Sequence, residues 1–366
     1  MFCGKTIVIY GPRQAGKTTA VETYLSANAN PSDIVSFNGD ETSDQQLLAD
    51  ASAEKLRLLT GRKKILFIDE AHKVPNIGLV LKRAWDKLKD VQVIASGSSS
   101  VALADQIEEP MTGRKFDYVL MPPSFAELAA ETSPAEETRM IERRMTYGMY
   151  PDVVAHPGDE VDRLRAIAKG YLYKDIFSMG EIKRPELLDR ILSALAFQIG
   201  QEVVYSELAQ TVGTDNKTVA KYIDILEKAY VIRKVSSYAR NLRNELKKSR
   251  KIYFNDCGIR NCIIGDWRPV NMRGPVEAGR LWENYLVAER AKRRLVVEPE
   301  TREFFWRTTQ QQEIDLVEES VSGMSAFEFK WNPRRGGTPA PKTFRTAYPD
   351  ADCRTVTPLN VFEFLC

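Results

Sequence analysis

The chain carries Gly-Pro-Arg-Gln-Ala-Gly-Lys-Thr at residues 11–18, which fits the pattern Gly-x4-Gly-Lys-[Ser/Thr] at every fixed position. An apolar β-branched run precedes this stretch at residues 6–10, and a helical pattern begins at Lys17. A strand, a glycine-rich loop and a helix in this order surround phosphate with backbone N–H groups. A glycine turn that only joins a strand to a helix is the alternative. We expect ATP to bind through Gly11, Pro12, Arg13, Gln14, Ala15, Gly16, Lys17, Thr18 and Thr19.

The side chains in and near this loop are expected to have separate roles in binding and hydrolysing ATP. Lys17 is expected to reach the β- and γ-phosphates, and the Thr18 hydroxyl is expected to complete a Mg²⁺ shell. A second apolar run at residues 64–68 ends in Asp69-Glu70. We expect Asp69 to hold Mg²⁺ through water and Glu70 to act as the general base that polarises the attacking water.

Two further residues are candidates for contacts with the γ-phosphate. Ser98 follows the predicted strand at residues 91–95, and a solvated Ser/Gly turn is the alternative interpretation. Arg114 precedes a predicted strand at residues 118–121 and is expected to stabilise transition-state charge from its own chain or from a neighbouring subunit. A surface salt bridge is an equal alternative for this arginine.

The composition describes an ordinary soluble chain, with 43% hydrophobic and 28% charged residues and a formal net charge of +2. No apolar run approaches the ~18 residues of a membrane span, so no membrane association is expected. The five cysteines are scattered and only two histidines are present, so no zinc spacing exists. We expect a cytoplasmic protein.

The middle of the chain predicts a winged helix-turn-helix. Helical patterns cover residues 188–199, 206–212 and 217–229, and residues 231–238 suit a β-wing. The third helix would place Asn216, Lys217, Lys221 and Tyr222 in a DNA groove. The alternative is a module that only packs against the nucleotide domain and senses its state.

A basic run supports nucleic acid as a possible partner. Between Lys228 and Lys251, only Glu245 opposes the positive charges. We expect phosphate contacts from Lys217, Lys221, Arg233, Lys234 and the run that continues to Lys251. A solvated charged surface is the alternative.

The last hundred residues resemble the core of the PD-(D/E)xK nuclease superfamily. Residues 313–317 and 326–331 read as a hairpin in which Glu328 and Lys330 share one face. With Asp315 on the preceding strand and Glu283 on a predicted helix at residues 280–294, they would bind a metal ion at a scissile phosphate. A binding module that has lost catalysis is the alternative.

The ordered motifs also resemble a known family, the prokaryotic AAA ATPases with a C-terminal domain of unknown function, series number 4143. The resemblance is carried by the phosphate loop, by Phe-Ile-Asp-Glu-Ala-His-Lys-Val-Pro at residues 67–75, and by segments that continue to residue 261. Asp69-Glu70-Ala71-His72 also spells a helicase box. However, no second run of alternating strands and helices with an arginine motif follows residue 150.

These observations predict an α/β fold with three parts. A P-loop AAA domain with a parallel sheet spans residues 1–128, a helical lid with a winged helix spans residues 129–238, and a nuclease-like α/β domain spans residues 239–366. We expect an ATPase that uses nucleotide as a conformational switch on or near nucleic acid, with homo-oligomers possible. An ATP-gated regulator whose nuclease-like domain is inactive is the alternative.

Overall fold

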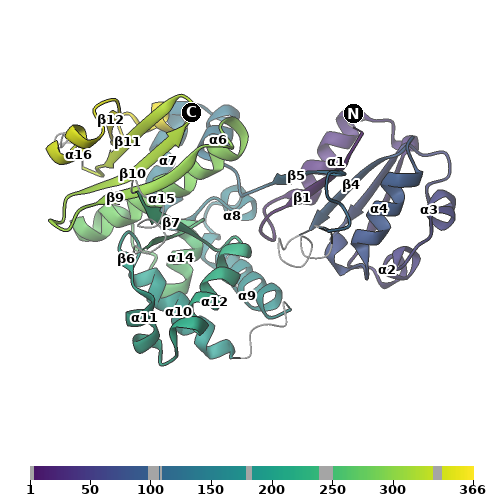
Figure 1. Cartoon of the computed structure of the whole chain (residues 1–366), viewed down its shortest axis with the longest axis horizontal. Helices are drawn as coiled ribbons and strands as arrows, with labels where there is room; N and C mark the ends of the chain where they lie inside the picture. Colours follow the sequence, from purple (N-terminus) through teal and green to yellow (C-terminus); the bar gives the residue numbers. More distant parts are fainter. Residues whose placement is uncertain (1–3, 98–106, 108, 179–183, 239–249, 333–339) are drawn as a thin grey trace. The chain divides into compact units, whose positions relative to one another are not determined.

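The computed structural model describes residues 4–97, 107, 109–178, 184–238, 250–332 and 340–366. The chain divides into two compact units, Met1–Pro122 and Pro123–Cys366 (Figure 1). Among the described residues, no helix is both long enough and apolar enough to cross a bilayer.

Unit 1 alternates strands with helices. Its elements are β1 (Thr6–Tyr10), α1 (Lys17–Asn28), β2 (Ile34–Asn38), α2 (Thr42–Leu48), α3 (Ala53–Thr60), β3 (Ile65–Asp69), α4 (Ile77–Lys87), β4 (Gln92–Gly97) and β5 (Lys115–Val119). The described strands form a parallel sheet in the order β2-β3-β4-β1-β5. The α/β class with a parallel sheet is therefore confirmed.

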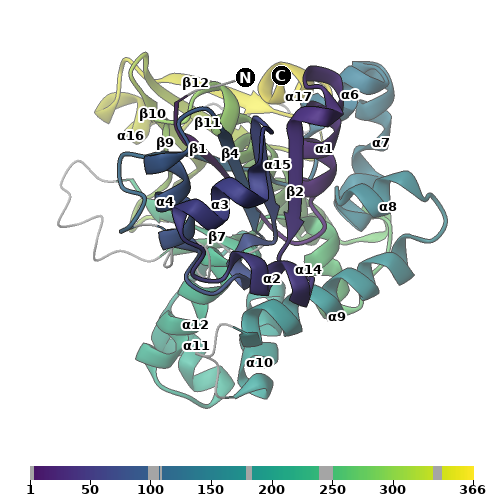
Figure 2. The same ribbon diagram turned by 90° about the vertical axis from the view of Figure 1, so that its right-hand side faces the viewer.

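The central strands β3 and β4 of unit 1 are buried on both faces, because helices cover both sides of the sheet. Val21 and Leu25 of α1 pack against a layer that includes Phe67 and Ile94. In Figure 2, α1 lies on one side of the strands, and α3 and α4 lie on the other. Such a sheet places its binding loops at the carboxyl ends of the strands, where the phosphate loop and Asp69 both lie.

Unit 2 begins with helices and ends with a strand-rich segment. Its elements are α6 (Phe125–Glu131), α7 (Pro134–Tyr147), α8 (Pro151–Ala155), α9 (Glu160–Ser178), α10 (Pro185–Phe197), β6 (Glu202–Val203), α11 (Tyr205–Val212), α12 (Asn216–Lys228), β7 (Ile232–Ser237), β8 (Arg250–Phe254), α14 (Cys257–Ile264), α15 (Pro275–Val297), β9 (Arg302–Arg307), β10 (Glu313–Ser320), β11 (Gly323–Phe329), α16 (Lys342–Ala347), β12 (Asp352–Val356) and α17 (Val361–Leu365).

One sheet runs through unit 2. Its described strands lie in the order β12-β11-β10-β9-β7-β8-β6, and β7 pairs in parallel with β9 through Ser236 and Phe304. The strands that follow α12 are therefore hydrogen-bonded to the strands of the C-terminal segment. The domain boundary that was predicted between residues 238 and 239 therefore falls inside one continuous sheet and inside one compact unit.

Helix α15 is the central helix of unit 2. Trp282, Tyr285 and Leu286 are each at most 2% exposed, and they belong to a core that also includes residues of β8, β11 and α17. The apolar face of this helix is stable only when it is enclosed. The helix also buries polar and charged side chains, which must find partners inside the unit: Glu283, Asn284, Glu289, Lys292 and Arg294.

A buried turn near Gly148 ties the helices of unit 2 together. The Asp256 carboxylate accepts hydrogen bonds from the backbone N–H groups of Met149 (2.7 Å) and Ile259 (3.1 Å). Gly148 has φ +77°, and an added Cβ would lie 2.0 Å from an oxygen of Asp256. The absence of a side chain at this position is what allows the carboxylate to approach.

We therefore predict that Gly148→Ala lowers the free energy of unfolding of unit 2 by more than about 1 kcal/mol. The matched control is Gly265→Ala, since Gly265 has φ +67° but no atom within 4 Å of the added Cβ. Chemical denaturation of both variants separates the backbone cost from the contact with Asp256. Equal destabilisation in the two variants would contradict this account.

Candidate nucleotide site and acidic cavity

The loop at residues 11–16 encloses a lysine ammonium. Lys17 is 5% exposed, and its Nζ donates hydrogen bonds to the carbonyl oxygens of Gly11 (3.1 Å) and Pro12 (2.8 Å). Gly11 has φ +148°, and an added Cβ would lie 1.9 Å from the Leu120 carbonyl oxygen. Only glycine therefore allows β5 to pack this closely against the loop.

Asp69 is held by hydroxyl groups from two other elements. The Thr18 hydroxyl donates to Asp69 Oδ2 at 2.7 Å, and the Ser96 hydroxyl donates to Asp69 Oδ1. Strand β4 lies between β1 and β3, so a side chain at its carboxyl end reaches the end of β3. Ser96 was not predicted, because the motif does not reveal the order of the strands in the sheet. Ser98, the predicted serine, lies outside the described residues.

Thr18 and Asp69 fit the predicted Mg²⁺ site. A hydroxyl and a carboxylate are hard oxygen donors of the kind that Mg²⁺ selects, and such sites usually use one or two carboxylates plus substrate phosphate. The two side chains already contact each other. The carboxyl ends of β1 and β3 thus bring together the two residues that were predicted to hold this ion.

Glu70 lies next to this pair in an unusual backbone conformation, φ +45° and ψ +40°. Burial raises the pKa of its carboxyl group, against the opposing effect of the Lys17 ammonium. His72 Nδ1 lies 3.2 Å from Glu70 Oε2. Burial, with a further contribution from Lys73, lowers the pKa of His72 to about 4, so the ring beside Glu70 is neutral at pH 7.

Arg114 does not lie at the phosphate loop. Strand β5 is parallel to β1 with Thr6 opposite Lys115, so Arg114 is at the amino end of the sheet and the loop is at the carboxyl end. The strands separate the two by roughly 13 Å. Its Nε lies 3.6 Å from Asp86 Oδ1, and its guanidinium lies over the Trp85 ring. The expectation that Arg114 acts within its own chain is therefore wrong, and a role toward a neighbouring subunit stays a prediction.

The second site surrounds a cavity of about 750 Å³ in unit 2. The four residues predicted from the nuclease resemblance all line it: Glu283 of α15, Asp315 of β10, Glu328 of β11 and the adjoining Lys330. Lys330 Nζ donates to Glu328 Oε2 at 3.0 Å, and the Phe329 N–H donates to Asp315 Oδ2 at 2.7 Å. The expected convergence of helix and hairpin is present in the structure.

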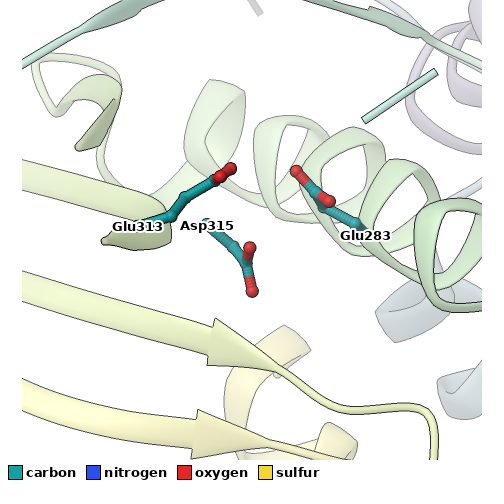
Figure 3. A group of neighbouring side chains, drawn as sticks. All are labelled: Glu283, Glu313 and Asp315. Atoms are coloured by element: carbon teal, nitrogen blue, oxygen red, sulfur yellow. The ribbon is translucent and has the colours of Figure 1, made fainter. Parts of the chain in front are cut away.

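A third carboxylate close to Glu283 and Asp315 was not predicted. Glu313, at the start of β10, offers an oxygen that lies within 4.8 Å of oxygens of both residues. Figure 3 shows Glu283 and Glu313 pointing toward one another, with Asp315 beside them. The sequence pattern that could have identified Glu313 is the alternation of side chains along β10, because residues 313 and 315 lie on the same face of a strand.

Lys251 of β8 also contacts these carboxylates, although it was predicted to contact nucleic acid. Its side chain is 1% exposed, and Nζ donates to Glu283 Oε1 at 2.7 Å and forms an ion pair with Glu313. The Tyr253 hydroxyl donates to the same oxygen of Glu283 at 2.6 Å. Burial opposes the charged form of Lys251, but the surrounding carboxylates outweigh it and raise its pKa.

Burial raises the pKa of three carboxyl groups of the cavity, those of Glu283, Asp315 and Glu328. Burial raises the pKa of Glu283 to about 7, against the opposing effect of Lys251. Burial likewise raises the pKa of Asp315 to about 6, with Lys251 opposing and Glu328 adding to the rise. Repulsion between the carboxylates raises these pKa values further but contributes less than burial does.

The predicted basic surface is only partly exposed. Lys217 and Lys221 are exposed on α12, but Tyr222 is 4% exposed and belongs to the core. Arg233 pairs with Glu303 at 2.9 Å, and Lys234 pairs with Asp224 and Glu227. Tyr222 and Lys251 are buried, so the expectation that they contact nucleic acid is wrong. Residues 239–249 of the basic run lie outside the described part of the chain.

Family comparison covers both units. Residues 4–129 match the model of an AAA domain. Residues 138–268 match a domain of unknown function (DUF8612), and residues 278–361 match another (DUF4143). The chain is an AAA-type protein with a C-terminal DUF4143 domain. The resemblance stated from the sequence motifs is thereby confirmed.

Two curated relatives of this AAA protein are described only as uncharacterized proteins. A protein of Mycobacterium tuberculosis is 27% identical over 349 residues, which cover 94% of this chain and 74% of the relative. A protein of Haemophilus influenzae is 26% identical over 313 residues, which cover 78% of this chain and 74% of the relative.

Solved structures similar to this AAA protein include origin recognition complexes. The Aeropyrum pernix ORC1 protein in complex with DNA aligns with a TM-score of 0.35 and 13% identity, covering 72% of this chain and 87% of that one. Drosophila ORC bound to DNA aligns with a TM-score of 0.27 and 12% identity, covering 72% and 90%.

The environment of His72 predicts a pH effect on stability. Because the pKa of His72 is near 4 in the folded chain and the ordinary pKa of histidine is 6.5, the unfolded chain binds the proton more readily between these values. The contribution of His72 is therefore full above pH 6.5 and is lost as the pH falls toward 4. Thermal unfolding of wild type and His72→Gln at pH 7.5 and pH 5 tests this. The advantage of wild type over the variant is expected to shrink at pH 5, and a constant difference would contradict it.

Proposed function

We propose that unit 1 binds Mg-ATP and hydrolyses it, and that nucleotide acts as a conformational switch for unit 2. The observation that carries this proposal is the cluster of Lys17, Thr18, Asp69, Glu70 and Ser96 at the carboxyl ends of β1, β3 and β4. The match of residues 4–129 to an AAA domain supports the same chemistry.

Each residue of this site has its own role in the transfer of a phosphoryl group to water. The Lys17 ammonium exchanges its bonds to loop carbonyls for bonds to phosphate oxygens, because charge-assisted hydrogen bonds are stronger than neutral ones. Thr18 and Asp69 would hold Mg²⁺, which neutralises charge on the phosphates. Glu70 accepts a proton from the attacking water, and the higher pKa caused by burial makes it a stronger base.

Neutral His72 contacts Glu70 without supplying a positive charge. A protonated ring at this distance would lower the basicity of the carboxylate. The site thus combines a buried base with a neutral neighbour, which suits proton abstraction near pH 7.

For unit 2 we propose a winged helix joined to a nuclease-like domain, with nucleic acid as the partner. The order helix, short strand, helix, helix and two antiparallel strands from α10 to β8 supports the winged helix. Lys217, Lys221 and Lys228 recur at intervals of four and seven residues on α12, which places them along one helix face. An exposed stripe of lysines is suited to phosphate contacts.

The ATPase proposal predicts opposite effects for two substitutions. Lys17→Ala is expected to lose ATP binding, because it removes the charge that contacts the phosphates. Glu70→Gln is expected to bind Mg-ATP normally and to hydrolyse it about 10²–10⁴-fold more slowly, because only the base is lost. Calorimetric binding and phosphate release measure the two effects separately.

His156→Gln serves as the control, since His156 lies on the exposed surface of unit 2. Unchanged turnover in both Lys17→Ala and Glu70→Gln would contradict the proposal. Partial recovery of turnover on mixing Glu70→Gln with Arg114→Ala protein would support action of Arg114 from a neighbouring subunit, and no recovery would exclude it.

The nucleic-acid proposal predicts that Lys217→Ala/Lys221→Ala weakens DNA binding and flattens its dependence on salt. Each lost phosphate contact is expected to reduce the slope of log affinity against log salt by about 0.9. The control is Lys342→Ala, an exposed lysine on α16. Titration of labelled DNA at several salt concentrations measures the slope, and equal slopes for wild type and both variants would contradict a role for α12.

A further inference from the structure

Lys251 places a positive charge among the carboxylates of the unit 2 cavity. It forms ion pairs with Glu283 and Glu313, two of the three residues whose oxygens lie within 4.8 Å of one another. Three such oxygens in one small volume are a donor set for a divalent cation. The structure shows an ammonium group bonded to two of these three carboxylates.

The position of the ammonium is fixed by the sheet. Lys251 lies on β8, opposite Val235 of β7 on one side and Glu202 of β6 on the other. Its backbone therefore has hydrogen-bonded strands on both sides. Its side chain is almost completely buried, and Nζ lies 5.5 Å from the centre of the Phe305 ring. Moving the ammonium out of the site would leave buried carboxylates without a counter-charge, which is strongly unfavourable.

A divalent ion and this ammonium compete for the same oxygens. Glu283 Oε1 already accepts hydrogen bonds from Lys251 and from Tyr253 at 2.7 and 2.6 Å. A metal ion bound to Glu283 and Glu313 would lie within a few ångströms of the ammonium, where repulsion between positive charges is large. Lys330, the other lysine of the cavity, instead pairs with Glu328.

We propose that Lys251 is the resident cation of this site and takes the place that a divalent metal ion would hold between Glu283, Glu313 and Asp315. The cavity of the folded chain then binds its ligand without metal-dependent hydrolysis. The carboxylates keep their capacity to bind metal, which is revealed when the ammonium is removed. This inference does not depend on ATP binding in unit 1.

The test is a Mn²⁺ titration by calorimetry, with every protein carrying Asp69→Asn so that the predicted metal ligand of unit 1 is removed. The parent chain is expected to bind no Mn²⁺ at the cavity. Lys251→Met is expected to bind one Mn²⁺ at the cavity, because the ammonium group that repels the ion is removed. Lys169→Met is the control, because it removes an exposed lysine of α9 that does not line the cavity, and it should behave like the parent.

Adding Glu313→Gln to Lys251→Met should abolish the new site. The proposal is overturned if the parent chain binds Mn²⁺ and Glu313→Gln removes that binding, or if folded Lys251→Met binds none. If Lys251→Met is unfolded without metal, recovery of its circular dichroism signal with Mn²⁺ supports the proposal. If Lys251→Met stays unfolded with Mn²⁺, the titration of the parent chain is the test. No binding of Mn²⁺ by the parent chain supports the proposal, and binding that Glu313→Gln removes overturns it.

Discussion

A buried ammonium must be surrounded by acceptors, and the nature of these acceptors distinguishes the two sites of this protein. Lys17 donates to the backbone carbonyls of Gly11 and Pro12, which are neutral dipoles. Lys251 donates to Glu283 and pairs with Glu313, which are carboxylates. A triphosphate competes well with carbonyls for an ammonium, whereas it gains little from one that already has anionic partners. We therefore propose that the same chemical group serves a phosphate site in unit 1 and fills a cation site in unit 2.

In unit 1, the sequence predicted those features that a short motif fixes by itself. Lys17, Thr18 and Asp69 converge as expected because each follows a strand whose direction and chain order the motif implies. Ser96 was missed because the position of β4 between β1 and β3 depends on strand order. Arg114 was placed at the wrong end of the sheet for its own chain, since the strand β5 begins immediately after it rather than at residue 118.

In unit 2, the local periodicity of the sequence predicted which side chains share a face of a strand. The arrangement of the sheet depends instead on pairing between strands that lie far apart in the sequence. The alternation along β10 and β11 correctly placed Asp315, Glu328 and Lys330 around one cavity. No local pattern indicates that β7 would pair with β9, and this pairing is part of the continuous sheet that includes Lys251. Tyr222 was assigned to a surface although its helical spacing from Val219 and Leu226 places it on the buried face.

The central claim is that the loop around Lys17 exchanges backbone carbonyls for phosphate oxygens. A crystal structure of the full chain with Mg²⁺ and a non-hydrolysable ATP analogue tests this most directly. The account predicts that Lys17 Nζ leaves the carbonyls of Gly11 and Pro12 and contacts the β- and γ-phosphates, with Mg²⁺ near Thr18 and Asp69. Nucleotide bound elsewhere, or bound in the loop while Lys17 keeps both carbonyl bonds, would contradict it.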